Sequence, residues 1–216
     1  MAKQRKKEER MKAARILGVV CLMGALGLGG CASFPAEEVP RTTMPLVSQD
    51  DRPSVYVDFR FYQGEPGAGA AEVPGAREAM HTLLDERFRN SGLFSRYTFD
   101  AAEKRAGDHV LKIRAYNHGS AFLAALSGGI SGATLGIIPG TGKDEYTLTM
   151  ETLDPAGNSI QNARNHDSVR FWIGWVILPL SNNTPRDALM DTMTRQIDAL
   201  LADLANSRRL HQLAQR

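Results

Sequence analysis

The first 31 residues constrain this chain most, because a basic start, an apolar run and a cysteine follow one another in that order. Seven lysines and arginines precede an apolar segment from Ile16 to Leu28, and small residues follow it. This is the three-part order of a secretory signal, and the apolar run is too short to be kept as a membrane span. We therefore expect residues 1–30 to be a signal peptide that is removed, which leaves 186 residues to form the folded protein.

The cysteine at the end of this stretch indicates a more specific class of signal peptide. Leu28-Gly29-Gly30-Cys31 resembles the lipobox of bacterial lipoproteins. The resemblance implies cleavage between Gly30 and Cys31, a diacylglycerol on the Cys31 thiol and a further acyl chain on the new amino group. Two or three acyl chains, each methylene contributing about 0.8 kcal/mol, hold a protein on a bilayer far more firmly than one chain. An uncleaved N-terminal anchor is the alternative.

The location follows from the residues after the cysteine. In the enterobacterial sorting pattern an aspartate after the cysteine retains a lipoprotein at the inner membrane, and here Ala32 and Ser33 follow. The resemblance therefore implies an outer-membrane lipoprotein that faces the periplasm, with no cofactor other than the covalent lipid on Cys31. No disulfide is expected, because Cys21 leaves with the signal and Cys31 carries lipid.

The net charge gives no reason to expect a nucleic-acid partner. The whole chain carries a formal charge of +2, but the signal alone carries +5, so the mature chain is at about −3. The basic residues are thus mainly a targeting feature, and a basic binding surface for nucleic acid is not predicted.

After Cys31, the sequence divides into a linker, one domain and a tail. Residues 31–53 comprise the lipidated cysteine and a polar, proline-rich segment that we expect to be a flexible tether. Residues 54–210 are expected to form a single periplasmic domain, and 211–216 a basic tail. Hydrophobic periodicity predicts strands near 55–62, 97–99, 110–116, 146–151 and from 159, and helices at about 75–90 and after Thr184.

These elements predict an α+β fold: an antiparallel-dominated sheet with two helices packed on one face and a Gly-rich apolar insert. The first helix should end at Gly92, where a left-handed residue suits a helix C-terminus. The second should begin with Thr184 as N-cap and an acid, Asp187, at the third position. On that second helix we expect Arg195, Asp198 and Asp203 to lie outside the core.

The insert, residues 119–142, contains an uncharged stretch from 121 to 138. Small residues recur every four positions in it, as in helices that pack closely in membranes: Ser120, Ala124, Gly128, Gly132, Gly136 and Gly140. One helix of this stretch would be about 27 Å long, but a crossing would separate strands that should share a sheet. Three possibilities remain: a hairpin that dips into one leaflet, packing between copies of the chain, or an arm buried against residues 171–180.

The second apolar stretch, residues 171–180, is too short to cross a bilayer as a helix and suits a strand buried on both faces. Trp172 and Trp175 suit either a core or the interfacial belt of a membrane protein.

Catalytic and metal-binding patterns are incomplete. Gly140-Thr141-Gly142-Lys143 lacks the first glycine and the hydroxyl of a phosphate loop, and Gly129-Ile130-Ser131-Gly132 lacks a spacer of a nucleophile elbow. The histidines have no metal-ligand spacing, although His109 and His118 could approach each other on a hairpin, and His166-Asp167 could orient a ring. We predict no catalytic residue and no metal site.

The segment from Leu83-Leu84 to Ser91-Gly92-Leu93-Phe94, followed by a Tyr-Thr-Phe strand, resembles small periplasmic modules of envelope assembly and secretion lipoproteins. The mature chain also resembles uncharacterised proteobacterial outer-membrane lipoproteins. The resemblance brings no catalytic residues. Our first hypothesis is a non-enzymatic accessory or assembly protein that binds an envelope partner through segments 121–138 and 171–180. A self-associating, membrane-inserting subunit that packs through the small-residue stripe is the alternative, and a periplasmic hydrolase is a third hypothesis. The candidate contact residues are Phe122, Leu126, Gly128, Gly132, Gly136, Trp172 and Trp175.

Overall fold

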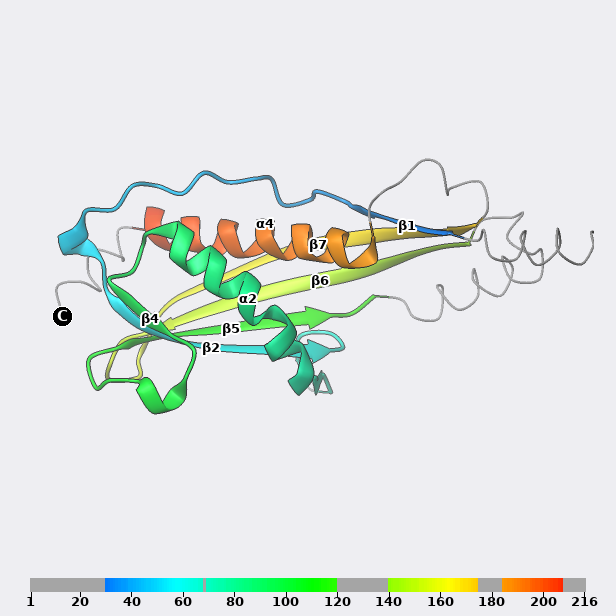
Figure 1. The fold of residues 1–216 in the computed structure, drawn as a ribbon. Helices are drawn as coiled ribbons and strands as arrows, with labels where there is room; N and C mark the ends of the chain where they lie inside the picture. Colours follow the sequence, from blue (N-terminus) through cyan, green and yellow to red (C-terminus); the bar gives the residue numbers. More distant parts are fainter. Residues whose placement is uncertain (1–29, 68, 120–139, 175–183, 208–216) are drawn as a thin grey trace, which may run out of the picture.

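The described residues of the computed structural model, 30–67, 69–119, 140–174 and 184–207, form one mixed sheet of seven strands with two helices (Figure 1). The strands are β1 Gly30–Pro35, β2 Ser54–Gln63, β3 Ala71–Glu72, β4 Arg96–Thr98, β5 His109–Asn117, β6 Gly140–Leu153 and β7 Ser159–Gly174. The helices are α2 Pro74–Ser91 and α4 Pro185–Asn206, and single 3₁₀ turns lie at Gln49–Asp51 and Ala101–Glu103. The predicted α+β class is confirmed.

The sheet is mostly antiparallel, as expected. Its strand order is β1-β7-β6-β5-β2-β3, and β4 also pairs with β2. The long hairpin of β6 and β7, together with β1 and β5, gives the antiparallel part, whereas β2 runs parallel to β5 and to β4. These parallel pairs arise because α2 carries the chain from the end of β2 back to the side of the sheet where β2 began.

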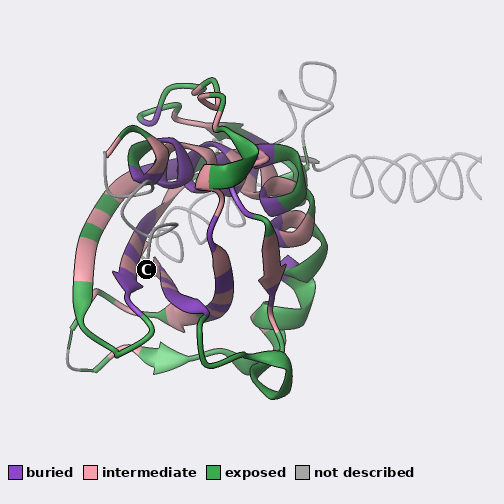
Figure 2. Cartoon of the chain, turned by 90° about the vertical axis from the view of Figure 1, so that its left-hand side faces the viewer, coloured by how far each residue is buried: buried purple, intermediate pink, exposed green. Residues whose placement is uncertain are grey.

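The two faces of the sheet differ sharply. One face, here called the helix face, is covered by α2 and α4, which share a single core with it (Figure 1). The strands show the expected alternation, since Val55, Val57 and Phe59 of β2 are buried while Asp58 and Arg60 project from the other side, the open face. A view along the strands shows buried residues on the helices and at alternate strand positions (Figure 2). The described open face is largely polar, with Asp58 and Arg60 of β2 and Arg164 of β7 among its side chains.

Both helix boundaries follow local sequence rules. Gly92 ends α2 with a φ of 62°, the left-handed conformation that glycine adopts without strain. Thr184 and Asp187 form a reciprocal capping box at the start of α4, with Pro185 at its first position. Both predicted ends are confirmed.

One prediction for α4 is wrong: Arg195 was expected outside the core but is only 2% exposed. Asp203 is exposed, and Asp198 is half-buried next to Arg87 of α2, with Arg87 Nε 3.5 Å from its carboxylate. Arg195 is buried because α4 is covered on a second side by residues that precede β2.

The N-terminal part of the predicted tether is instead folded. Residues 30–35 form β1, an edge strand paired with β7, and Ala32 and Ser33 are buried. Residues 36–53 then run along the outer side of α4 (Figure 1), where Val39 is buried and Met44 and Val47 pack on the core. The expectation of a flexible tether is wrong here, because polar, proline-rich composition does not reveal that an open sheet edge is available for pairing.

The predictions for the insert fall largely outside the described residues, which exclude 120–139 and 175–183. Within the described part, Gly140 is the first residue of β6 and pairs with Ile173, so it does not continue a helical stripe. Gly142 lies under the ring of Phe171, where a Cβ would overlap the ring. Trp172 is 42% exposed, so the described end of β7 is not buried on both faces as predicted.

Candidate functional site

The predicted lipidation residue lies at one end of the sheet. Cys31 is the second residue of β1 and pairs with Ile173 of β7, which in turn pairs with Gly140 at the start of β6. The ends of β1, β6 and β7 extend together beyond α4 (Figure 1). Only one residue of β1 precedes Cys31, so a lipid on this residue would join directly to the folded sheet.

Next to Cys31, the open face carries exposed aromatic and basic side chains. Trp172 pairs with Ala32, and the following row contains Phe34, Arg170 and Lys143 on three adjacent strands. Phe34 is 39% exposed and Trp172 is 42% exposed, and among the described residues these are two of the four exposed large hydrophobic side chains. We call Phe34, Trp172 and Arg170 the aromatic-basic rim.

The two basic residues of this row have different surroundings. Lys143 Nζ lies 3.0 Å from Glu145 and 3.5 Å from Glu38, and the hydrogen bond with Glu145 raises the pKa of this lysine. Arg170 is exposed, and no carboxylate of the described chain lies within ion-pair distance of it. Arg170 is thus the basic side chain of the rim that can interact with an external anion.

Further from Cys31, an aromatic row crosses the open face. Tyr62 and Tyr116 stack with ring centroids 5.1 Å apart. His118 and His166 lie 5.6 Å apart, and Thr147 Oγ1 is 2.8 Å from one ring and 3.3 Å from the other. His118 therefore meets His166 and not His109, which lies at the opposite end of β5, so the suggested approach of His109 and His118 is wrong.

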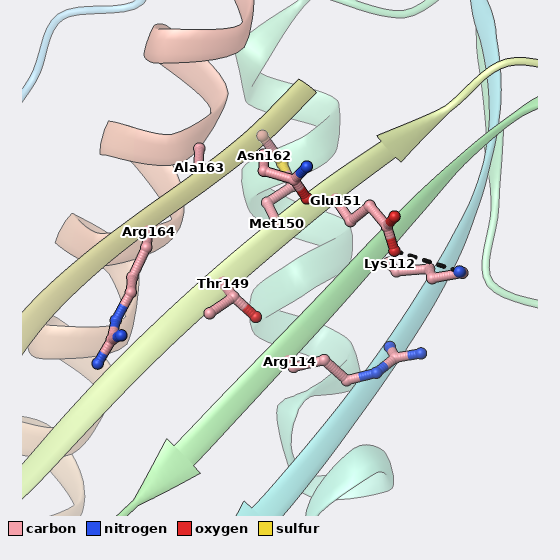
Figure 3. A pocket seen from close by; sticks show the side chains of 8 residues that line it. All are labelled: Lys112, Arg114, Thr149, Met150, Glu151, Asn162, Ala163 and Arg164. Carbon is pink, nitrogen blue, oxygen red and sulfur yellow. Dashed lines mark hydrogen bonds and ion pairs between the residues drawn. The ribbon is translucent and has the colours of Figure 1, made fainter. Parts of the chain in front are cut away.

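A hollow of about 350 Å³ lies beside this row on the open face (Figure 3). Lys112 and Arg114 of β5 line one side and Arg164 of β7 the other. Lys112 Nζ is 3.2 Å from Glu151, and Arg114 Nη2 is 2.5 Å from Asp58. The hollow is therefore polar, and two of its three cations are already paired.

The Asp58 carboxylate stays charged despite its partial burial. Burial opposes its charged form, but the hydrogen bond and charge of Arg114, aided by Arg60, outweigh that effect and lower the pKa of Asp58. The pair of Arg114 and Asp58 connects β5 to β2 on the open face, in addition to the backbone pairing of these strands.

A second hollow, of about 430 Å³, lies on the helix face near the start of α4. Its lining is largely apolar and includes Phe171 and Leu189, with Asp144 and Tyr146 as polar members. Burial raises the pKa of the Asp144 carboxyl, against a hydrogen bond with Tyr146. Burial and the neighbouring Asp144 also raise the pKa of the Tyr146 hydroxyl far above its ordinary value.

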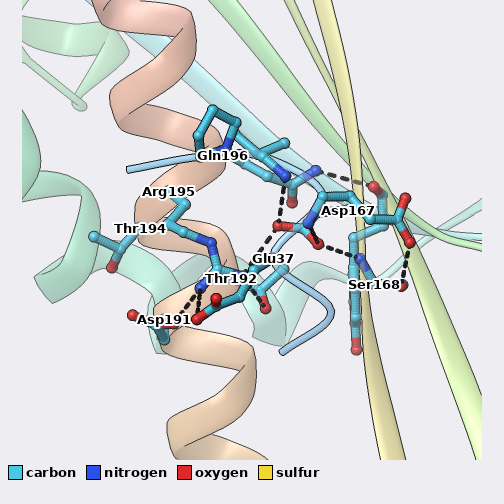
Figure 4. A network of polar contacts seen from close by, with 12 residues as sticks. Glu37, Asp167, Ser168, Asp191, Thr192, Thr194, Arg195 and Gln196 are labelled. Atoms are coloured by element: carbon cyan, nitrogen blue, oxygen red, sulfur yellow. Dashed lines mark hydrogen bonds and ion pairs between the residues drawn. The ribbon is translucent and has the colours of Figure 1, made fainter. Parts of the chain in front are cut away.

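A buried polar network fastens the N-terminal segment to the domain (Figure 4). Asp167, on the helix face of β7, is fully buried and accepts hydrogen bonds from the backbone N–H groups of Glu38, Val39 and Ser168, at 3.1, 3.4 and 2.7 Å. Arg195 Nη2 donates to the same carboxylate at 3.1 Å.

The same guanidinium also pairs with Asp191 one turn earlier on α4, and it lies 3.9 Å from Glu37. One ion pair thus connects β7, α4 and the segment that follows β1. This pair was not predicted from the sequence, although the position of Asp167 within the alternation of β7 would have placed that side chain on the helix face.

The structure brings together only some of the predicted site residues. Gly30, Cys31 and Trp172 lie at the same end of the sheet. The other candidate contact residues, Phe122, Leu126, Gly128, Gly132, Gly136 and Trp175, lie outside the described residues. Among the described residues, no group of three histidine, cysteine or acidic side chains is placed to hold a metal ion. Neither described helix is long and apolar enough to cross a membrane.

Comparisons with known proteins assign no family to this chain. No protein-family model and no curated protein matches it. Among solved structures it is similar to the PelC dodecamer from Paraburkholderia phytofirmans, with a TM-score of 0.35 and 13% identity over 81% of this chain and 98% of that chain. It is also similar to a minor lipoprotein from Acinetobacter baumannii, with a TM-score of 0.37 and 13% identity over 78% and 94%.

A third similar structure is a DUF4136 family protein from Bacteroides thetaiotaomicron, with a TM-score of 0.31 and 8% identity over 82% of this chain and 95% of that chain. At these TM-scores the likeness is too weak to support an argument about family or function. The functional argument therefore rests on the chain's own residues.

Proposed function

We propose that this chain is a lipid-anchored outer-membrane lipoprotein that faces the periplasm and acts as a non-enzymatic accessory or assembly factor. The observation that carries the proposal is the order of the first 31 residues: a basic start, an apolar run, and Leu28-Gly29-Gly30-Cys31. The backbone of Cys31 lies at an end of the sheet, as the second residue of β1, and this position supports the proposal of an anchor there.

The anchor is tested by metabolic labelling with palmitate, intact-protein mass spectrometry and membrane fractionation. We expect label in the wild type and a mass that corresponds to residues 31–216 with attached acyl chains. Cys31→Ser should abolish the label, whereas the matched control Cys21→Ser should keep it, because Cys21 belongs to the signal.

The anchor proposal fails if the wild type incorporates no palmitate and keeps its full mass. It also fails if Cys31→Ser fractionates as the wild type does. A location at the inner membrane after sucrose-gradient separation would contradict the outer-membrane part alone.

The accessory role is proposed to act through the apolar segments 121–138 and 171–180, which we expect to contact an envelope protein. A photo-reactive amino acid at Leu126, activated in intact cells, should give one defined adduct with another protein. The same group at Asn162, an exposed position on β7, is the control and should give none. The accessory role is contradicted if Leu126 gives no adduct, or if it gives the same adducts as Asn162.

A further inference from the structure

The distance between the anchor and the folded domain decides how the domain sits on a membrane. A flexible tether of residues 32–53 would have an r.m.s. length of roughly 26 Å and would leave the domain free to rotate. In the structure, residue 31 already belongs to β1 and pairs with Ile173. No free chain therefore separates the lipidation residue from the sheet.

The side chains near Cys31 fit the polar layer of a bilayer. The headgroup region on each side of the hydrocarbon core is roughly 5–8 Å thick. Trp172 pairs with the residue after Cys31, so it lies about 3 Å further along the strands, inside this layer. The row of Phe34 and Arg170 lies at about 10 Å, just outside the layer, where it would face the membrane surface. Tryptophan and other aromatic rings prefer this layer because they have both apolar and polar parts.

Charge points to the same surface. Arg170 belongs to the aromatic-basic rim and is exposed, without a carboxylate in ion-pair distance in the described chain. Anionic lipids attract a basic side chain that lies close to the membrane surface. Two exposed aromatic rings beside a cation with no carboxylate partner among the described residues are thus complementary to an anionic phospholipid surface, and the acyl chains at Cys31 would hold them there.

We propose that the end of the sheet that carries Cys31 lies directly on the phospholipid surface, with Trp172 in the headgroup layer and with Phe34 and Arg170 at the outer boundary of that layer. The domain is then held in one orientation, with the β6–β7 turn directed away from the membrane. This proposal rests on the proposed function, because it requires acyl chains at Cys31. It goes further by naming the membrane-contacting surface and the direction in which the rest of the sheet points.

The test uses the full lipidated protein, purified from cells and placed in vesicles of phosphatidylethanolamine and phosphatidylglycerol with brominated acyl chains, which quench nearby tryptophans. The chain has two tryptophans, so Trp175→Phe leaves Trp172 as the only probe. We expect brominated lipid to lower its emission at least about twofold relative to unbrominated lipid, as for an indole at the membrane interface. Should Trp175→Phe fail to fold, the Trp172→Phe protein gives the signal of Trp172 by subtraction from the wild type.

The matched control moves the probe along the same strand. Asn162 is exposed on the same face of β7, about 33 Å from Trp172. With both natural tryptophans replaced by phenylalanine, Asn162→Trp should show no quenching. A charge control compares Arg170→Glu, which should reduce the quenching of Trp172, with Arg164→Glu further along the same face, which should not.

Equal quenching at positions 172 and 162, or no quenching at 172, overturns the proposal. A photo-reactive group at position 172 that forms adducts only with protein, whether another protein or a second copy of this chain, and none with lipid overturns it as well. Mass spectrometry of each sample separates this failure from failure of the proposed function. If lipid is present on Cys31 but Trp172 is not quenched, only the orientation is wrong, whereas absence of the lipid refutes the anchor.

Discussion

Replacing Arg195 by methionine should lower the free energy of unfolding by about 3 kcal/mol, because it leaves the Asp167 carboxylate buried without its counter-charge. Both side chains are almost completely inaccessible, at 2% and 0% exposure. Breaking a buried pair from one side costs about 3–5 kcal/mol. The lower end applies here, since three backbone N–H groups still donate to Asp167 after the change.

Removing the charge of Asp167 should lower the free energy of unfolding less than removing Arg195. Asp167→Asn leaves the guanidinium of Arg195 close to Asp191 and Glu37, so its charge keeps partners, and we expect a loss of about 2 kcal/mol. Because the two residues share one interaction, the double variant should lose less stability than the sum of the single variants.

Urea unfolding of the detergent-solubilised protein, followed by circular dichroism, measures these changes. The matched control is Arg41→Ala, which removes another arginine that pairs with Asp191, at 2.7 Å, but is 70% exposed. It should cost about 1 kcal/mol or less, as exposed pairs do. A loss for Arg195→Met no larger than that for Arg41→Ala would refute the argument that burial makes this pair important.

Three further changes test local features of the fold. Gly92→Ala forces a non-glycine residue into the left-handed C-cap of α2, so thermal unfolding should show a loss of about 1 kcal/mol. Gly142→Ala places a Cβ against the ring of Phe171 and should lower the melting temperature clearly, whereas Gly107→Ala, where a Cβ meets nothing, should not; equal effects would contradict the overlap. The raised pKa of Asp144 means that the charged carboxylate destabilises the folded state, so Asp144→Asn should increase the melting temperature at pH 7. This gain should vanish below about pH 4, because the aspartate is then protonated in both the folded and the unfolded state. A gain for Asp144→Asn that persists at low pH would refute the titration argument.

Features set by nearby residues could be predicted well. The ends of α2 and α4 follow from Gly92 and from the box of Thr184 and Asp187, because helix caps depend on residues within one turn. The strand β2 follows from its alternation of apolar and polar residues. The turn between β6 and β7 falls between the strands predicted at 146–151 and from 159, and the backbone N–H of Asp154 donates to the carbonyl of Asn158 at 2.9 Å there.

The errors concern positions whose surroundings come from distant parts of the chain. Arg195 was assigned to an exposed side of α4 from the helical pattern, but residues 36–53 cover that side. The same 36–53 segment was expected to be unstructured, although its backbone is tied to Asp167 some 130 positions later, with separations of 129 and 128 residues. The pattern of apolar and polar residues predicts which side chains are buried, but it does not predict which distant segment of the chain buries them.

The sequence by itself is the basis of the proposed compartment and the proposed anchor, since a signal and its cysteine are read as a linear motif before the chain folds. It also determined the helix ends and the α+β class, which depend on local pattern. Only the tertiary structure decided that residue 31 belongs to an edge strand with no free tether between it and the sheet, and that Phe34, Trp172 and Arg170 lie beside it. The reason is physical: strand pairing joins backbones that are far apart in the chain, and no local pattern specifies the partner of an edge.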